Sequence, residues 1–424
     1  MHPIRSRSLF ACVVLLTLTF SLWAQDLPLA KPEEVGMSSD RLQRLTAVFQ
    51  AYAADKKMAG SVVLIARHGK VAYFNSFGKR DIESNAAMQN DAIFRIASQT
   101  KALISVGILI LQEEGKLLIS DPVGKYIPEF NESTVAVPRE GGGYDVVKAR
   151  RAITLRDLLT HTAGISYGSG PAADKWKEAG ITGFYFSDRD EPIGATIARM
   201  GKLPMDAHPG EKYIYGYNTD ILGVVIEKAS GKSLNEFIAS KILSPLGMKD
   251  THFYLPQEKL NRFATVYSAF ADKPLERAPD AGTITSQGSY VNGPRKSFSG
   301  GAGLLSTSSD YAKFLQMLLN KGTLNGTRIL APSTVELMTV SHTGKIDFRP
   351  GQGFGLGFSV VEDLGDRGVP GSVGEYGWGG AYGSTYWVDP KEDLVVVYMK
   401  QLIPTNNLDD HNKLRALIYQ AIVK

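Results

Sequence analysis

A serine and a lysine three residues apart, Ser98 and Lys101, open a long apolar run in the first third of the chain. The run from Ser98 to Glu114 has no proline and Gly115 can end it, so the sequence predicts a buried helix. Residues i and i+3 share one face of a helix, so the hydroxyl and the amine can meet. Apolar neighbours strip the amine of water and favour its neutral, proton-accepting form. The pair could act as a nucleophile and its base.

The same spacing occurs a second time, at Ser76 and Lys79. This copy follows the segment Lys70 to Asn75, which is typical of a strand. In a strand, residues i and i+3 point to opposite faces, so this hydroxyl and this amine cannot cooperate. The spacing alone therefore does not identify a site, and the backbone around it decides.

The composition is that of a large globular protein. The 424 residues are 43% hydrophobic and 21% charged, enough for an extensive core in two or three lobes. The net charge is +4, and no basic stripe interleaved with aromatic residues indicates a nucleic-acid partner. Cys12 is the only cysteine and lies in the N-terminal apolar run, so a processed chain would have neither a disulfide nor a thiol nucleophile.

Residues 1 to 24 have the pattern of a secretory signal. Arg5 and Arg7 precede an apolar run from Leu9 to Trp23, and Ala24 can form the cleavage edge. We expect a secreted or periplasmic protein with no stable membrane insertion after cleavage. An uncleaved anchor is the alternative, although the apolar run is short for a membrane span.

Strand patterns at both ends of the chain enclose a mainly helical middle. A helix is expected after the capping signal Ser38 to Asp40, followed by a hairpin turning at residues 67 to 69. Strands return at residues 355 to 360, 383 to 388 and 394 to 399, and a last helix is expected near residues 407 to 423. We therefore predict an α/β domain from residues 25 to 120 and 293 to 424, and a helical domain from 121 to 292. A cleft between them is the expected active site.

Competing chemistries have weaker support. Gly164-Ile165-Ser166-Tyr167-Gly168 matches the G-x-S-x-G elbow, but that motif needs a strand before the serine and a helix after it, and neither pattern is present. His252, His342 and His411 have no motif around them, and His161 fits a structural turn. The sequence has no metal-ligand or phosphate-loop spacing, so we expect no metal and no cofactor.

Three segments together resemble the serine β-lactamase and penicillin-binding protein superfamily, and most of all the family VIII carboxylesterases related to class C β-lactamases. They are Ser98 to Lys101, Pro209 to Gly223 and Gly377 to Gly383, with support from residues 158 to 164 and 299 to 307. The resemblance covers the chain from about Glu34 to the C-terminus. It implies a serine β-lactamase/DD-peptidase-like fold of the α/β (α+β) class, with an antiparallel sheet flanked by helices and an inserted, mainly helical domain.

The resemblance also implies roles for particular residues. It implies that Ser98 and Lys101 are catalytic and that the catalytic tyrosine is Tyr215, five residues after the pair Pro209-Gly210. The backbone N–H groups of Ser98 and Ala381 would form the oxyanion hole. Substrate-binding positions would be Tyr217, Trp378, Gly379 and Gly380. Tyr213 and Tyr217 alternate with Tyr215, so either could be mistaken for the catalytic tyrosine.

Departures from the family pattern bear on the substrate. Trp378 stands where penicillin-recognising members carry the lysine of Lys-Thr-Gly, and a tryptophan offers an apolar face and one N–H donor. Loss of that cation favours short-chain neutral esters. We expect a serine carboxylesterase with possible side activity on β-lactams such as cephalosporins. The alternatives are a class C-like β-lactamase, a D-alanyl peptidase, or a non-catalytic cell-wall binding protein on the same fold.

Overall fold

The computed structural model describes residues 26–280 and 283–424. The predicted signal segment at residues 1–24, Cys12 included, lies outside the described residues. Within the described part of the chain, no helix combines the length and apolar character needed to cross a bilayer.

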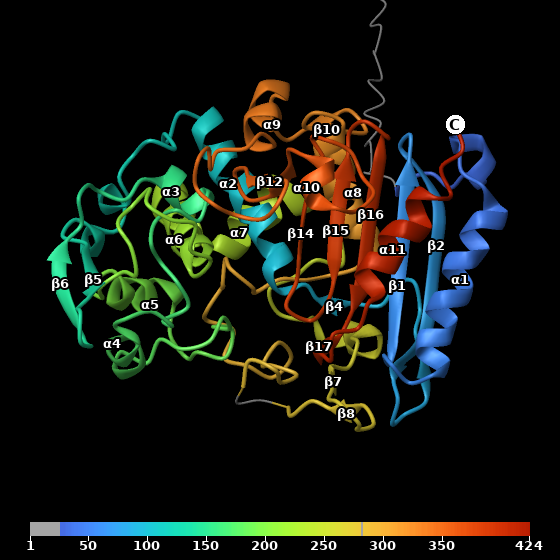
Figure 1. Cartoon of the computed structure of the whole chain (residues 1–424), viewed down its shortest axis with the longest axis horizontal. Coiled ribbons are helices and arrows are strands. Elements are labelled where there is room, and N and C mark those ends of the chain that lie inside the picture. The colour runs from blue at the N-terminus through green and yellow to red at the C-terminus, as the bar shows by residue number, and fades with distance from the viewer. Residues whose placement is uncertain (1–25, 281–282) are drawn as a thin grey trace, which may run out of the picture.

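An antiparallel sheet of eight strands occupies the right half of the molecule as seen in Figure 1. Its order is β12-β13-β14-β15-β16-β1-β2-β3, so strands from the two ends of the chain meet where β16 pairs with β1. The strands are β1 (Gly60–Arg67), β2 (Lys70–Asp81), β3 (Ala86–Ala87), β12 (Gln352–Phe354), β13 (Ser359–Val361), β14 (Tyr376–Gly379), β15 (Thr385–Asp389) and β16 (Leu394–Lys400).

The central strands are buried on both faces. In β1, Val62 and Leu64 face one hydrophobic core, whereas Val63 and Ile65 face another. Side chains alternate across a strand, so a strand covered on both faces becomes continuously apolar. This explains why all eight residues of β1 are buried.

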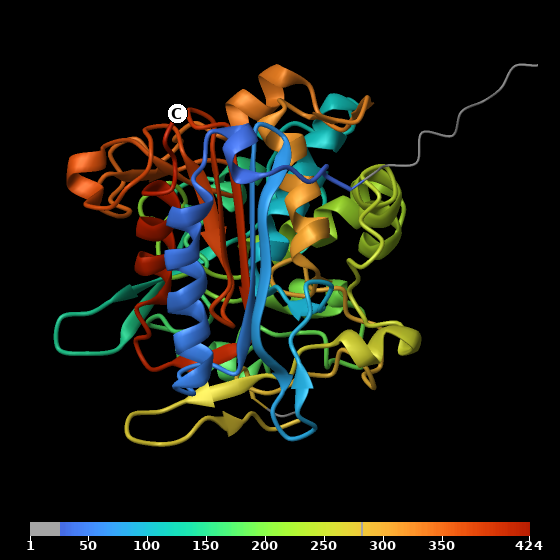
Figure 2. The same ribbon diagram turned by 90° about the vertical axis from the view of Figure 1, so that its right-hand side faces the viewer.

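Helices cover the two faces of the sheet (Figure 2). On one face lie α1 (Ser39–Ala54) and α11 (Asp410–Tyr419), which pack against each other. On the other face lie α8 (Ser308–Leu319) and α2 (Thr100–Glu113). Every residue of α2 from Thr100 to Leu111 is buried, as expected for a helix that is apolar all round. The helix beginning just after Ser98 is therefore fixed deep inside the molecule.

The region between residues 121 and 292 is mainly helical and lies beside α2, with α6 (Asn218–Ser230) against it. Its other helices are α3 (Leu155–Leu159), α4 (Ala173–Glu178), α5 (Ile193–Met200) and α7 (Leu234–Ile238). It also contains the hairpin of β5 (Thr134–Pro138) and β6 (Tyr144–Lys148), and the strands β7 (Tyr267–Ala269) and β8 (Glu276–Arg277). The exact domain boundaries at residues 120 and 292 stay a prediction.

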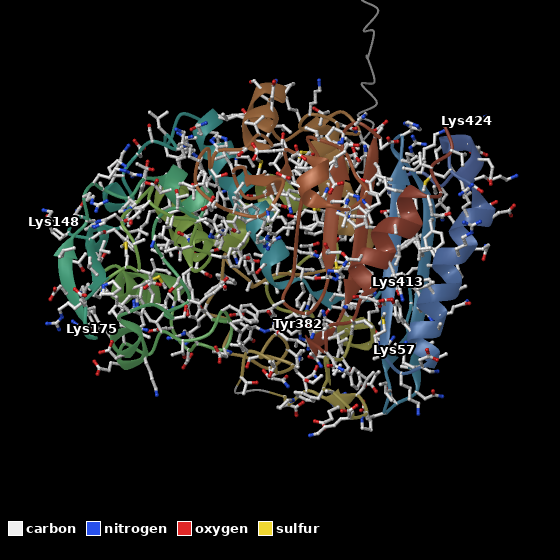
Figure 3. All side chains as sticks on the ribbon, viewed as in Figure 1. Lys57, Lys148, Lys175, Tyr382, Lys413 and Lys424 are labelled. Carbon is white, nitrogen blue, oxygen red and sulfur yellow. The ribbon has the colours of Figure 1, made fainter. Side chains whose placement is uncertain are left out.

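The remaining elements connect these parts. β17 (Leu402–Thr405) pairs with β7 and so joins the C-terminal segment to the middle region. Two short pairs are β4 (Phe94–Arg95) with β9 (Leu305–Ser306), and β10 (Thr323–Leu324) with β11 (Thr327–Arg328). The last two helices are α9 (Pro332–Met338) and α10 (Leu364–Arg367). Figure 3 shows Lys148 and Lys57 near opposite ends of the molecule, with Tyr382 between them.

Most sequence-predicted elements are confirmed, with differences at their ends. The N-terminal helix has Ser38 as its cap, and the β1–β2 hairpin turns where predicted. The strand predicted at residues 355 to 360 is wrong in its extent, because β12 ends at Phe354 and β13 begins at Ser359. Between them the chain turns through Gly357, whose φ of 103° suits glycine. The segment of Trp378 is β14, which has two strands beyond it and so is not at the sheet edge.

Candidate active site

Ser98 lies in a short 3-10 turn, Ala97–Gln99, directly before α2. The residue before it, Ala97, is buried and has a φ of 43°, a left-handed conformation that side chains other than glycine rarely adopt. Such a conformation costs about 1–3 kcal/mol and persists only where neighbours impose it. Gln401 helps to impose it, because its side chain accepts from Arg95 N at 3.1 Å and donates to Arg95 O at 3.0 Å. The turn holding Ser98 is thereby tied to the end of β16.

The amine of Lys101 lies inside a cage of three oxygen atoms. It contacts Ser98 Oγ at 3.2 Å, Tyr167 Oη at 3.1 Å and the Gly301 carbonyl at 2.8 Å, and the side chain is 3% exposed. The amine can donate one hydrogen bond to each of these three oxygen atoms, which fixes its position beside Ser98. The predicted meeting of hydroxyl and amine is therefore present in the structure.

The Gly301 carbonyl is held in place by Asp220, a buried residue of α6. Asp220 Oδ1 accepts from Gly301 N at 2.9 Å and from Ser299 Oγ at 2.7 Å. A Cβ atom at Gly301 would lie 2.2 Å from Asp220 Oδ2, so only glycine fits there. Burial raises the pKa of the Asp220 carboxyl, and the charge of Lys101 opposes that rise. Asp220 thus positions the carbonyl that contacts Lys101, a role that the sequence interpretation did not include.

Tyr215 presents the face of its ring to the Lys101 amine. Lys101 Nζ lies 4.7 Å from the ring centroid, a cation–π distance for a charged amine. The Tyr215 hydroxyl accepts a hydrogen bond of 3.0 Å from Trp378 Nε1. Its ring packs 4.6 Å from that of His161, whose pKa is lowered by burial and by the charge of Lys101. The structure brings Tyr215 to the site, with its hydroxyl directed to Trp378 and not to Ser98.

The hydroxyl beside Lys101 belongs instead to Tyr167, a residue that the sequence interpretation passed over. Burial raises the pKa of Tyr167 well above its ordinary value, with Tyr215 contributing, so its hydroxyl stays protonated. Tyr167 is the fourth residue of the rejected elbow motif, and Ser166 Oγ accepts from the N–H of Gly168 in a turn that follows α3. The elbow geometry is absent, and the segment supplies a tyrosine, not a nucleophile.

Tyr217 does not line the cavity, contrary to its predicted place in substrate binding. It is fully buried, its ring stacks on Trp176 and Phe186, and its hydroxyl donates to the Gly183 carbonyl. It meets Tyr167 edge-on at 4.9 Å between ring centroids. The structure therefore gives Tyr217 a packing position behind Tyr167.

The turn after β14 brings Ala381 to the same cavity as Ser98. A Cβ atom at Gly380 would lie 2.6 Å from the Ile96 carbonyl, so glycine allows this turn to approach the backbone next to Ser98. The N–H of Gly380 donates to Ser384 O at 2.8 Å. The N–H of Ala381 has no acceptor in the described part of the chain, as an oxyanion donor requires.

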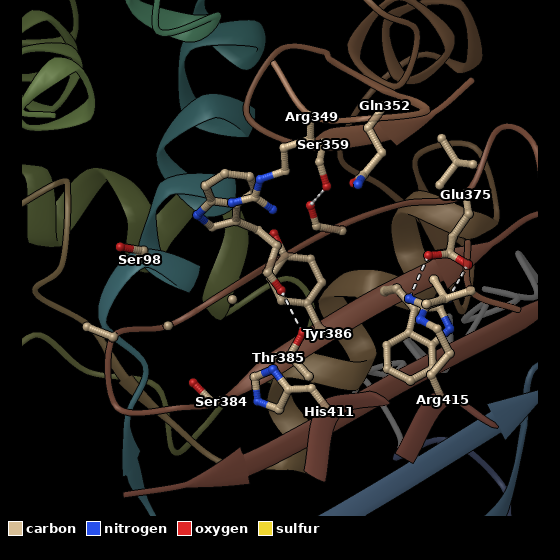
Figure 4. Close-up of a pocket in the computed structure, with 18 of the residues that line it drawn as sticks. Ser98, Arg349, Gln352, Ser359, Glu375, Ser384, Thr385, Tyr386, His411 and Arg415 are labelled. Carbon is tan, nitrogen blue, oxygen red and sulfur yellow. Dashed lines mark hydrogen bonds and ion pairs between the residues drawn. The ribbon is translucent and has the colours of Figure 1, made fainter. Parts of the chain in front are cut away.

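A cavity of about 570 Å³ extends from Ser98 along β14 toward α11 (Figure 4). Trp378, Gly379 and Gly380 line it together with Tyr215. Charged residues line it as well, and Arg367 and Arg415 both pair with the buried Glu375, at 2.8 and 2.7 Å. Figure 4 shows this ion-pair group and Ser98 on opposite sides of the cavity. The cavity thus combines aromatic side chains with charged ones, and the Glu375 ion pairs lie across it from the serine.

The structure also bears on a metal site and on the second serine–lysine spacing, neither of which was expected to be functional. Residues 26–280 and 283–424 hold no group of three histidine, cysteine, aspartate or glutamate side chains placed to bind a metal ion. Ser76, the other serine of the repeated spacing, lies in β2 and donates to the Met88 carbonyl. The prediction that catalysis needs no cofactor stays a prediction.

Comparison with known proteins agrees with this geometry. The Beta-lactamase family profile matches residues 45–420. Esterase EstB of Burkholderia gladioli is 30% identical over 370 residues, covering 84% of this chain and 89% of that protein. Protein Rv1367c of Mycobacterium tuberculosis is 33% identical over 371 residues, covering 83% and 88%. The solved structure of EstCE1, described as a hydrolase with promiscuous acyltransferase activity, has a TM-score of 0.76 at 28% identity and covers 89% of this chain and 98% of that one.

The chain therefore belongs to the beta-lactamase family. The resemblance to family VIII carboxylesterases and the predicted fold class, an antiparallel sheet flanked by helices with an inserted helical part, are confirmed.

Proposed function

We propose that the protein is a serine carboxylesterase that hydrolyses short-chain esters through an acyl-enzyme on Ser98. The observation that carries the proposal is the buried Lys101 amine 3.2 Å from Ser98 Oγ, where Ser98 lines a cavity of about 570 Å³. Support comes from relatives whose names describe an esterase and a hydrolase. A serine beside a desolvated amine is a recurrent arrangement for acyl transfer.

In the first step, Lys101 accepts the Ser98 proton while Ser98 Oγ forms a bond to the ester carbonyl carbon. The backbone N–H groups of Ser98 and Ala381 stabilise the negative oxygen, and each such donor is worth about 3 kcal/mol in comparable enzymes. Lys101 then gives the proton to the departing alcohol, which leaves the acyl group on Ser98. Tyr215 and Tyr167 enclose the amine and keep it oriented.

In the second step, water attacks the acyl carbonyl. The same amine accepts a proton from that water and returns one to Ser98 as the acid leaves, so the enzyme is regenerated. The rings of Trp378 and Tyr215, 5.3 Å apart, both line the cavity and would form an aromatic wall for a short acyl chain. Neutral short-chain esters are the substrates that the loss of the family lysine favours, with β-lactams such as cephalosporins as side substrates.

The test compares a short-chain p-nitrophenyl ester with a chromogenic cephalosporin, by kcat/KM. Faster ester turnover supports the carboxylesterase, whereas a cephalosporin preference supports the class C-like β-lactamase. A preference for D-Ala-D-Ala peptides supports the D-alanyl peptidase.

Covalent labelling tests the acyl-enzyme directly. A fluorophosphonate probe should label the wild type and the Ser76→Ala control but not Ser98→Ala, as seen by intact mass. Absence of labelling in the wild type contradicts the proposal and favours the non-catalytic cell-wall binding protein.

A further inference from the structure

An arginine stands over the tryptophan that replaces the family lysine. Arg349 lies in the loop before β12 and lines the same cavity as Ser98 and Tyr215. Its guanidinium carbon is 4.9 Å from the Trp378 ring centroid and 5.0 Å from that of Phe348. The two rings are nearly parallel, with an interplanar angle of 23°. Figure 4 shows Arg349 on the same side of the cavity as Gln352 and Ser359.

Arg349 is the arginine of this cavity whose charge is not neutralised. Arg367 and Arg415, the two others that line it, share the carboxylate of Glu375. No carboxylate among residues 26–280 and 283–424 lies within ion-pair distance of Arg349, and no acceptor there takes a hydrogen bond from its side chain. A guanidinium stacked on an aromatic face keeps the N–H groups at its edge available to a ligand.

The other polar groups near Trp378 are already engaged. Trp378 Nε1 donates to Tyr215 Oη, so the single donor of the tryptophan is not available to substrate in this arrangement. Ser359 Oγ donates to the Gly377 carbonyl at 2.9 Å, and Thr385 Oγ1 donates to the Trp378 carbonyl at 3.2 Å. Arg349 is therefore the group at this wall that combines a positive charge with free donors.

We propose that Arg349 recognises a carboxylate carried by the substrate, so that the preferred esters are those with an anionic group a few atoms from the scissile carbonyl. This inference rests on the proposed esterase function and specifies its substrate class. The argument for neutral substrates considered only the lysine position in the sequence. In the folded protein, a cation reaches the same wall from a loop 29 residues earlier in the chain. A planar guanidinium and a carboxylate can form two parallel hydrogen bonds, which adds orientation to attraction.

The experiment uses two pairs of esters matched in size. In the acyl pair, p-nitrophenyl hemiglutarate and p-nitrophenyl valerate have acyl chains of equal carbon number and differ in the terminal carboxylate. In the alcohol pair, 4-carboxyphenyl butyrate and 4-methylphenyl butyrate differ in the same way on the leaving group, by a carboxylate in place of a methyl group. The readout is the ratio of kcat/KM within each pair, so a general loss of activity does not affect it. We expect the wild type to favour the anionic member of at least one pair.

Variants of Arg349 test whether this residue causes the preference for the anionic ester. Arg349→Gln should lower the ratio by about tenfold, mainly through KM, because an exposed charge-assisted pair is lost. Arg349→Lys should keep part of it, since the charge remains without the planar fork. Arg328→Gln, which removes an exposed arginine on β11 outside the cavity, is the control for net charge and should keep the wild-type ratio. Raising NaCl from about 0.05 M to about 0.5 M should reduce the wild-type ratio and leave that of Arg349→Gln nearly constant.

The outcomes separate this inference from the proposed function. Ratios that are equal in the wild type and Arg349→Gln for both pairs overturn the inference, while Ser98-dependent turnover of the neutral esters would leave the esterase intact. Turnover of no ester, or turnover unaffected by Ser98→Ala, overturns the proposed function instead.

Discussion

Ser98 with Lys101 and Ser76 with Lys79 have the same spacing, yet they lie in opposite surroundings. At the first pair the chain is helical, and hydroxyl and amine meet at 3.2 Å with the lysine 3% exposed. At the second pair the chain is strand β2, where Ser76 donates to the Met88 carbonyl and Lys79 to the Asn85 carbonyl. A motif of four letters thus acquires chemistry only from the backbone period and the burial around it. The second pair provides matched controls for the first.

Removing each serine in turn should give the largest difference between the two pairs. Ser98→Ala should lower kcat/KM for p-nitrophenyl butyrate by roughly 10⁴-fold, because no other group can form the acyl-enzyme. Ser76→Ala should stay within about twofold of wild type, since its hydroxyl only bonds a carbonyl of the chain. Equal effects of the two substitutions would contradict the assignment of the nucleophile.

Removing each lysine is expected to have the next largest effect. Lys101→Met keeps the length of the side chain and removes the proton acceptor, so kcat should fall by roughly 10³-fold. Lys79→Met, at a half-buried position of β2, should change kcat by less than about twofold. Thermal unfolding of both variants checks that they are folded. A Lys101→Met enzyme with near wild-type kcat would show that another base serves Ser98.

Removing single tyrosine hydroxyls tests which tyrosine supports the Lys101 amine. Tyr167→Phe removes an oxygen 3.1 Å from Lys101 Nζ and should lower kcat by about tenfold with little change in KM. Tyr217→Phe removes a hydrogen bond to the Gly183 carbonyl and should cost about 1 kcal/mol of unfolding free energy without that loss in kcat. A large KM increase in Tyr217→Phe would restore Tyr217 to substrate binding.

The smallest expected effect concerns Asp220 and depends on pH. Burial raises the pKa of Asp220 in the folded state, so the folded protein binds that proton more tightly than the unfolded chain does. Wild-type stability should therefore fall as pH rises from the ordinary carboxyl value of 3.8 to the raised folded value, and be constant above it. Asp220→Asn lacks this loss, so its unfolding temperature relative to wild type should increase across that window.

Local patterns in the sequence predicted much of the fold. The β1–β2 hairpin, α1 with its Ser38 cap, and the apolar α2 all follow from contacts between near neighbours in the chain. The pair Ser98 and Lys101 was predictable for the same reason. The strand boundary at Gly357 was not, since alternating glycines and apolar residues look alike in a strand and in a tight turn.

The rest of the site comes from distant segments. Tyr167, Gly301 and Arg349 reach the site from loops 66, 200 and 248 positions after Lys101. None has a motif of its own, and the segment that contains Tyr167 was considered only for its serine, Ser166. Resemblance placed Tyr215 at the site, but the direction of its hydroxyl depends on Trp378, which only tertiary packing supplies.

The cage around Lys101 has a consequence for the path of the proton. Two directions of the amine are occupied by Tyr167 and the Gly301 carbonyl, which leaves the direction of Ser98 Oγ for exchanging a proton with substrate. An alcohol can receive it only if its oxygen comes to lie beside Ser98 Oγ. The enzyme would then select its leaving group by position more than by acidity, and esters of ordinary aliphatic alcohols would come within its reach.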